Sequence, residues 1–376
     1  MTPAAATRMR LRAMIRKESL QVLRDPSSIA IAIVLPLVLL LLFGYGVSLD
    51  AKHVRIALVV EHADANTASL TGAFQHSEYF LPVEFQNIQQ AERSLEAHEV
   101  DGIVWLRNDF SSRLLLADDA AIGVFVNGVD ANQARITQGY IEGLWQTWLT
   151  SYARDHGHEL KMPVVLQPRI WFNPAVNSRN FLVPGLIAII MTLTGAMLTS
   201  MVVAREWERG TMEVLMVTPI RLWEITVGKL VPYFVLGMGG MLLTLAMAQL
   251  LFKVPLQGSF LVLTATSALY MMVALGMGLL ISSIARSQFV AGQVALVATF
   301  LPAFMLSGFI FHIGSMPEPV QIITHIVPAR YFVAILQTVF MAGDIWPVLL
   351  SNSAALLLMM LLFLGIARRN ARKRLD

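Results

Sequence analysis

The sequence contains 376 residues, of which 56% are hydrophobic and only 14% are charged, and its mean hydropathy is +0.62. A soluble domain usually contains about 25% charged residues, so this composition excludes a wholly water-exposed globular protein and indicates a membrane protein. The net charge is +3 and there is no cysteine, which excludes disulfides and cysteine-based metal sites.

Six uncharged windows are long enough to cross a bilayer, which takes roughly 20 apolar residues. They predict spans at about 29–49, 181–204, 230–252, 260–285, 289–311 and 347–367. The first window is longer than the apolar core of a signal peptide and begins far from the N-terminus. We therefore expect an uncleaved anchor there.

Residues 1–28 combine many basic side chains with an apolar stripe at Leu11, Met14, Ile15 and Val22. This pattern is typical of a helix that lies in the membrane interface; the alternative is a solvated basic tail. Lys and Arg favour the cytoplasmic ends of spans, and they flank both the first span and the last. We therefore expect both termini, including a basic C-terminal tail, to be cytoplasmic.

The segment 50–179, between the first and second spans, alternates strand-like and helix-like pieces. Strands are predicted at 55–61, 83–85, 102–106, 122–126 and 163–172, and helices at 66–76, 88–99, 109–116 and 129–154. This alternation predicts an α/β domain. The segment contains 16 Asp and Glu against 10 Lys and Arg, so it lacks the basic excess of the termini and is predicted to be periplasmic.

Residues 180–376 contain the other five spans, a cytoplasmic loop at 205–229 and an outer segment at 312–346. The apolar pieces of 312–346 are short and interrupted by proline, which predicts a re-entrant segment. Small residues at Ala274, Gly278 and Ser282 predict close helix packing by the fourth span. The predicted fold is a polytopic α-helical membrane protein with six transmembrane helices and an extracytoplasmic α/β domain between the first and second.

The sequence contains no G-x-x-x-x-G-K-[ST], H-E-x-x-H or G-x-S-x-G motif, so we expect no nucleotide site or hydrolytic centre in this chain. His156 and His158 could meet a metal, although such a pair at a helix end is more often simply solvated. The predicted spans contain no charged residue or histidine, whereas ion-coupled carriers place such groups on their path. Any driving energy is therefore expected to come from a partner.

The cytoplasmic loop contains equal numbers of basic and acidic residues: Arg205, Arg209, Arg221 and Lys229 against Glu206, Glu208, Glu213 and Glu224. A loop that served only the positive-inside rule would need no glutamates. We predict two short helices, the second restarting at Thr218-Pro219, with exposed charges of both signs that form a docking surface. The alternative is an amphipathic loop anchored by its tryptophans.

The stretch from Arg205 to Glu213 (REWERGTME), followed by Thr218-Pro219 and Glu224, closely resembles the corresponding loop of bacterial ABC-2 type permeases. These are the membrane subunits of ATP-binding cassette drug-efflux exporters. The resemblance covers almost the whole chain. It includes Arg24-Asp-Pro-Ser27, Phe43-Gly-Tyr-Gly46, Trp171-Phe-Asn-Pro174, Leu306-Ser-Gly-Phe309 and Pro328-Ala-Arg-Tyr-Phe332.

The resemblance implies a permease subunit that exports a hydrophobic or amphipathic compound, drug-like or lipid-like, across the bacterial inner membrane. ATP and Mg would be bound by a separate cytosolic ATPase, and this chain would hold no cofactor, metal or nucleic acid. A second permease subunit, identical or a sibling, and a periplasmic adaptor protein are the other implied partners. Residues 1–28 would form an elbow helix.

The family also implies roles for individual residues. The loop would carry a coupling helix that transmits ATPase closure through Arg205, Glu206, Glu208, Arg209, Gly210, Thr211 and Glu213, with a second, smaller contact at Arg286. The second and fifth spans would line the path, with candidates at Asn180, Thr192, Thr299, Phe304 and Met305, although such residues more often pack against helices or lipid. A membrane sensor or an envelope-assembly scaffold, with a ligand- or partner-binding periplasmic domain, is the alternative.

Overall fold

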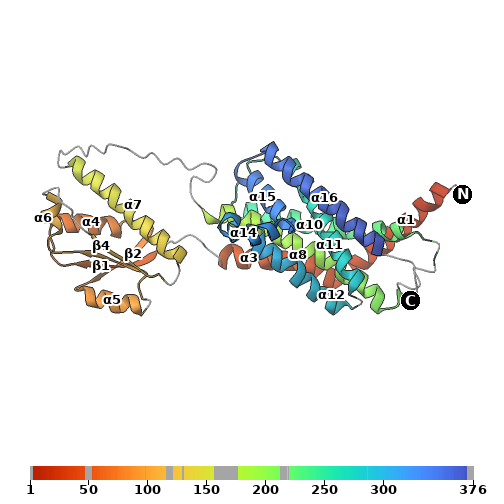
Figure 1. The fold of residues 1–376 in the computed structure, drawn as a ribbon, viewed down its shortest axis with the longest axis horizontal. Helices are drawn as coiled ribbons and strands as arrows, with labels where there is room; N and C mark the ends of the chain where they lie inside the picture. Colours follow the sequence, from red (N-terminus) through yellow and green to blue (C-terminus); the bar gives the residue numbers. More distant parts are fainter. Residues whose placement is uncertain are drawn as a thin grey trace. The chain divides into compact units, whose positions relative to one another are not determined.

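The computed structural model describes residues 3–46, 53–97, 99–115, 122–128, 131–155, 177–211, 218, 220–285 and 287–370. The chain divides into two compact units (Figure 1). Met1–Ser48 and Arg169–Asp376 form one, which we call the membrane unit, and Leu49–Pro168 forms the other, which we call the α/β unit. The predicted strand at 163–172, the histidines at 156 and 158 and the motif at 171–174 lie outside the described residues.

The membrane unit contains six helices, among the described residues, that are long and apolar enough to cross a bilayer. They are Pro26–Gly46 (α2 Pro26–Ile29, η1 Ala30–Val34 and α3 Leu35–Gly46), α8 Ser178–Glu208, α10 Leu222–Leu250, α11 Phe260–Ile284, Gln288–Leu306 (α12 Gln288–Ala295, η2 Leu296–Phe300 and α13 Leu301–Leu306) and α16 Trp346–Asn370. The predicted polytopic helical fold is confirmed. α8 continues into the charged loop as far as Glu208, and α10 begins within it at Leu222.

α8 lies at the centre of the membrane unit, where 89% of its most apolar window is buried. It packs against α11 along a seam of small residues. A Cβ atom added to Gly278 would lie only 1.9 Å from Thr199 Oγ1, and the same Thr199 hydroxyl donates to the Leu275 carbonyl at 3.0 Å. Close backbone approach of this kind is how helices associate in lipid, and the predicted packing role of Ala274 and Gly278 is confirmed, because Ala274 likewise approaches α8 at Gly195.

α1, Pro3–Leu23, precedes the first span and packs along α10. Met14 is buried against Gly228 of α10 and Val22 is buried in the core of the membrane unit, whereas Met9, Leu20 and Leu23 are exposed. Within the predicted apolar stripe, Met14 and Val22 are therefore not free to face the bilayer, whereas Leu11 and Ile15 are half-buried. Met14 and Val22 face protein, and the apolar residues left for the membrane interface lie on another face of the helix.

Two shorter helices between the fifth and sixth spans form a bent pair. α14, Glu318–Thr324, and α15, Pro328–Met341, meet at 83°, the geometry of a broken span or a re-entrant loop. The Arg330 guanidinium donates to the Gln321 carbonyl at 3.3 Å, so it supplies a donor where α14 ends and its carbonyls lose their helical partners. The assignment of 312–346, which also contains η3 (Ile313–Ser315), as re-entrant remains a prediction.

The α/β unit contains a four-stranded sheet of order β2-β1-β3-β4, in which only the β3–β4 pair is antiparallel among the described strands. Its elements are β1 Val54–Val60, α4 Ala65–Gln75, β2 Phe80–Phe85, α5 Ile88–Glu96, β3 Gly102–Leu106, α6 Phe110–Leu115, β4 Ile122–Val126 and α7 Ala131–Asp155. Ile56 and Leu58 point to the face covered by α4 and α7, and Ala57 and Val59 to the face covered by α5 (Figure 1). The predicted α/β alternation is therefore present, and its periplasmic location remains a prediction.

Candidate functional site

The charged stretch predicted to couple to an ATPase lies at the end of α8. Gly210 adopts φ +68°, the left-handed conformation that commonly ends a helix. Before this stop, Arg205 and Glu206 are only 7% and 3% exposed, whereas Glu208, Arg209, Gly210 and Thr211 are exposed. The stretch therefore divides into a buried half and an exposed half. Glu213 lies outside the described residues.

Glu206 belongs to a closed set of four charges that we call the ionic ring: Lys17, Glu18, Glu206 and Lys229. The Lys229 Nζ lies 2.8 Å from Glu206 Oε1 and 3.1 Å from Glu18 Oε1. The Lys17 Nζ lies 3.0 Å from the same two oxygens. The two cations balance the two carboxylates, so the ring is neutral as a whole even though three of its members are buried.

Three helices contribute to the ionic ring: α1 supplies Lys17 and Glu18, α8 supplies Glu206, and α10 supplies Lys229. Gly228 allows α1 to approach α10, since a Cβ atom there would lie 2.5 Å from Met14 Cγ. Partial burial lowers the pKa of Lys17, but the carboxylates of Glu18 and Glu206 outweigh it and hold that pKa above its ordinary value. The Lys17 ammonium therefore stays charged at neutral pH, and the ring ties three helices together.

Arg205 ties the end of α8 to two further elements. Its guanidinium donates to Asp25 Oδ2 at 2.7 Å, to Ser27 Oγ at 3.0 Å and to Gln288 Oε1 at 2.9 Å. Gln288 in turn donates to Glu208 through both its backbone N–H and its side-chain amide, each at 3.1 Å. Arg286 lies outside the described residues, but Gln288 brings the start of α12 to the end of α8, next to the predicted second contact.

Asp25 also starts the first span, because its carboxylate accepts from the Ser27 backbone N–H at 3.3 Å and from the Ser28 hydroxyl at 2.6 Å. Asp25 is thus the N-cap of α2. Burial raises the pKa of Asp25, but hydrogen bonds from Ser28, Ser27 and Arg205 outweigh it and hold the pKa well below its ordinary range. The carboxylate is therefore ionised where it meets Arg205.

A separate ion pair, outside the ionic ring, fixes the start of α10. Arg10 of α1 donates two hydrogen bonds to Glu224, at 3.1 and 2.9 Å, and Glu224 Oε2 accepts the Arg221 backbone N–H at 2.9 Å. Glu224 stands three residues after the N-cap Arg221, as in a capping box. The predicted helix start at Thr218-Pro219 is wrong, because the helix begins at Leu222, after the N-cap Arg221 whose backbone N–H the Glu224 carboxylate accepts.

Charges of both signs were predicted to be exposed on the loop, and Glu208, Arg209 and Arg221 are exposed. The other described charges of the loop are buried: Arg205, Glu206, Glu224 and Lys229. Sequence reasoning missed their partners: Arg10, Lys17, Glu18, Asp25 and Gln288. One signal was available, since Glu18 is the only acidic residue among the first 24. A single acid in a basic helix predicts a specific partner, although not which one.

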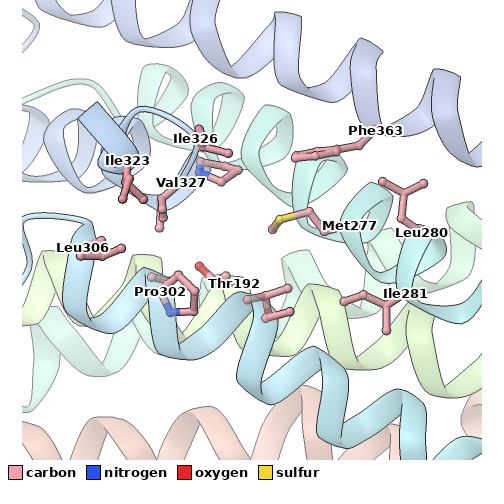
Figure 2. A pocket seen from close by; sticks show the side chains of 15 residues that line it. Thr192, Met277, Leu280, Ile281, Pro302, Leu306, Ile323, Ile326, Val327 and Phe363 are labelled. Atoms are coloured by element: carbon pink, nitrogen blue, oxygen red, sulfur yellow. The ribbon is translucent and has the colours of Figure 1, made fainter. Parts of the chain in front are cut away.

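Two of the five predicted path residues, Thr192 and Thr299, line one cavity of about 410 Å³ (Figure 2). The cavity lies between α8, α11, η2 with α13, the bend between α14 and α15, and α16. The other three do not line it. Phe304 packs against aromatic rings of Phe43, Phe300 and Phe309, Met305 is exposed, and Asn180 is half-buried in the first turn of α8.

Comparisons with known proteins agree with this architecture. Residues 26–369 match the profile of the ABC-2 family transporter proteins. The chain is 44% identical over 368 residues to the "Probable multidrug ABC transporter permease YbhS" of Escherichia coli K12, covering 98% of each chain. It is 29% identical to YbhR, which carries the same description, over 90% of this chain and 94% of that one, and 29% identical to the "Inner membrane transport permease YhhJ" over 78% and 80%. The chain is a multi-pass membrane protein that belongs to the ABC-2 family of transporters.

Proposed function

We propose that this protein is the permease subunit of an ATP-binding cassette exporter. It moves a hydrophobic or amphipathic compound outward across the bacterial inner membrane, and a separate cytosolic ATPase subunit, which binds ATP and Mg, supplies the energy. The names of the relatives support multidrug export. Both termini and the 205–229 loop face the cytoplasm in this proposal, and the α/β unit faces the periplasm.

The observation that carries the proposal is the exposed patch Glu208–Thr211 at the end of the most buried span. This patch offers one negative and one positive side chain next to a sharp helix stop, which suits a groove on an ATPase. The Arg209 guanidinium is exposed, so a partner could reach it without breaking the contacts that hold the helices.

In this proposal, the buried half of the stretch, Arg205 and Glu206, passes movement of the exposed patch on to the neighbouring helices. Glu206 is held to α1 and α10 by the ionic ring, and Arg205 is held to the start of the first span and to α12. A force on the exposed patch therefore acts on the ends of four helices besides α8. Buried pairs resist separation, because breaking one leaves an uncompensated charge at a cost of roughly 3–5 kcal/mol. ATPase closure would thus move these ends as one body.

The remaining partners are proposed from the resemblance to the family. A second permease subunit, identical or a sibling, completes the path, and a periplasmic adaptor contacts the α/β unit in this proposal. The chain itself supplies the transport path and the docking surface, while hydrolysis belongs to the ATPase.

The decisive test is charge reversal at Arg209. The variant R209E should insert and fold normally, lose co-purification with its ATP-binding cassette ATPase, and lose transport-stimulated ATP hydrolysis. The matched control is R368E, the same charge change at an exposed residue in the last turn of α16, which should retain both properties.

Unchanged ATPase binding and hydrolysis in R209E would refute the docking role of the patch. Loss of both properties in R368E as well would indicate a general charge effect on the cytoplasmic side. A membrane sensor or an assembly scaffold is favoured if no ATP-binding cassette ATPase co-purifies with the native protein.

A further inference from the structure

We propose that the cavity between α11, α13 and α16 binds the hydrocarbon chain of a membrane phospholipid, which enters sideways from the bilayer. This inference deepens the proposed function by naming a class of molecule that the permease holds. Binding itself requires neither the ATPase nor ATP, so it can be tested separately from export.

The cavity offers no hydrogen-bond donor from its described lining side chains. Only Thr192 and Thr299 have polar side chains there, and each hydroxyl donates to a carbonyl of its own helix, to Ala188 at 2.7 Å and to Ala295 at 2.6 Å. The Tyr270 hydroxyl meets Thr192 as well. A ligand with carbonyl, phosphate or carboxylate groups inside this space would leave them without a donor, which is costly in an apolar environment.

The cavity lies beside two irregular stretches of backbone. Its volume therefore does not depend on the rotamer of a single side chain. On one side, the π-helical turn η2 leads directly into Pro302, and on the other Pro328 begins α15 after the 83° bend. Proline has no N–H to donate and displaces the helix before it. Ala298 and Ala329 line the space with small side chains, so the cavity stays open where neighbouring helices diverge.

The mouth of the cavity is apolar. Ile323 and Ile326, labelled in Figure 2 among the lining side chains, are 51% and 73% exposed, and Ala298 is exposed as well. These residues belong to the fifth span and to the bent pair, and in this proposal they face the hydrocarbon core of the bilayer. The interior is thus continuous with the bilayer core.

A cavity lined by apolar side chains favours hydrocarbon over polar ligands. Apolar cavities of about 150 Å³ exclude water and bind small hydrocarbons, and this one, at about 410 Å³, is larger. Lipid acyl chains are the most concentrated hydrocarbon in a bilayer. An acyl chain is also flexible enough to adopt the shape of a cavity that extends between several helices. The phosphate headgroup would remain outside, at the level of the other lipids.

The experiment uses the full-length protein in vesicles of phosphatidylethanolamine and phosphatidylglycerol. A phospholipid with a photoreactive diazirine in the middle of one acyl chain is added, the vesicles are irradiated without ATP, and labelled peptides are identified by mass spectrometry. We expect labelling concentrated in residues 298–306 and 323–329. A phospholipid with the diazirine in its headgroup should not label these peptides.

Two neighbouring substitutions provide the control. A298W fills the cavity and should reduce labelling several-fold, whereas V297W places the same indole on an exposed residue outside the lining and should leave it unchanged. M277F, which narrows the space from α11, should act like A298W if the A298W variant does not insert. Equal labelling in all variants, labelling spread evenly over α16, or cross-links to a second copy of the chain at these residues would overturn the proposal.

Discussion

α8 is held in two different ways along its length. In its middle it packs against α11 through small residues, with Gly278 against Thr199 and Ala274 against Gly195. At its end it is held by charges, through Glu206 in the ionic ring and through Arg205. Helix association inside lipid gains little from burying apolar surface, so shape decides there. Near the end of a span, where charged groups lie closer to water and headgroups, ion pairs can specify which helices meet.

The middle and the end of α8 therefore contribute differently to the packing of the membrane unit. The seam of small residues fixes the distance between the α8 and α11 backbones, and a single added methyl group would increase that distance. The charged end fixes partners, since each carboxylate of the ionic ring accepts from cations on two other positions of the chain. Substitutions that remove one of these contacts at a time should therefore differ in their effect on stability.

The largest effect should follow from K229M. This change leaves Glu18 and Glu206 buried with only Lys17 between them, and loss of one partner in a buried pair costs roughly 3–5 kcal/mol. We expect a large fall in thermal stability of the purified protein in lipid nanodiscs, measured by tryptophan fluorescence. The control K253M removes an exposed lysine and should change little.

The double variant K229M/E206M sharpens the same test, because it removes one cation and one anion together. It should be more stable than K229M alone, as expected for coupled charges. If K229M unfolds at the temperature of the native protein, the ionic ring does not hold the helices.

A smaller loss should follow from G278A. The added Cβ atom would lie 1.9 Å from Thr199 Oγ1 and 2.4 Å from the Ala196 carbonyl oxygen, so the two backbones must separate, at a cost of about 1–3 kcal/mol for overpacking. G239A is the matched control, because a Cβ atom there meets nothing within 4 Å and alanine favours a helix by up to about 1 kcal/mol. Equal stability of the two variants would contradict the close seam.

The smallest effect should be a dependence on acid pH. The pKa of Asp25 is lowered in the folded protein, so its contribution is fully present above the ordinary pKa of about 3.9 and is lost as pH falls toward the lower folded value. Stability should therefore decline below about pH 4, and D25N should make that part of the curve flatter. A D25N curve with the native slope would show that other carboxylates account for it.

The pattern of charges and apolar windows predicted much of the fold. The six spans follow from uncharged windows of sufficient length, and the strands at 55–61, 102–106 and 122–126 agree closely with β1, β3 and β4. The charged stretch at 205–213 was rightly singled out as unusual. Its environment could not be predicted, because Glu206 meets Lys17 across 189 positions and Arg205 meets Asp25 across 180.

The sequence by itself determined that this is a six-span membrane protein with an inserted α/β segment, and it carried enough of the family's motifs to indicate an ABC-2 permease. Local composition is sufficient for this, since hydrocarbon thickness and backbone satisfaction act on each segment separately. Only the tertiary structure decided which charges of the loop are buried and which can be reached by a partner. That choice depends on where α1 lies against α10, and a contact between distant segments is set by packing that no single segment encodes.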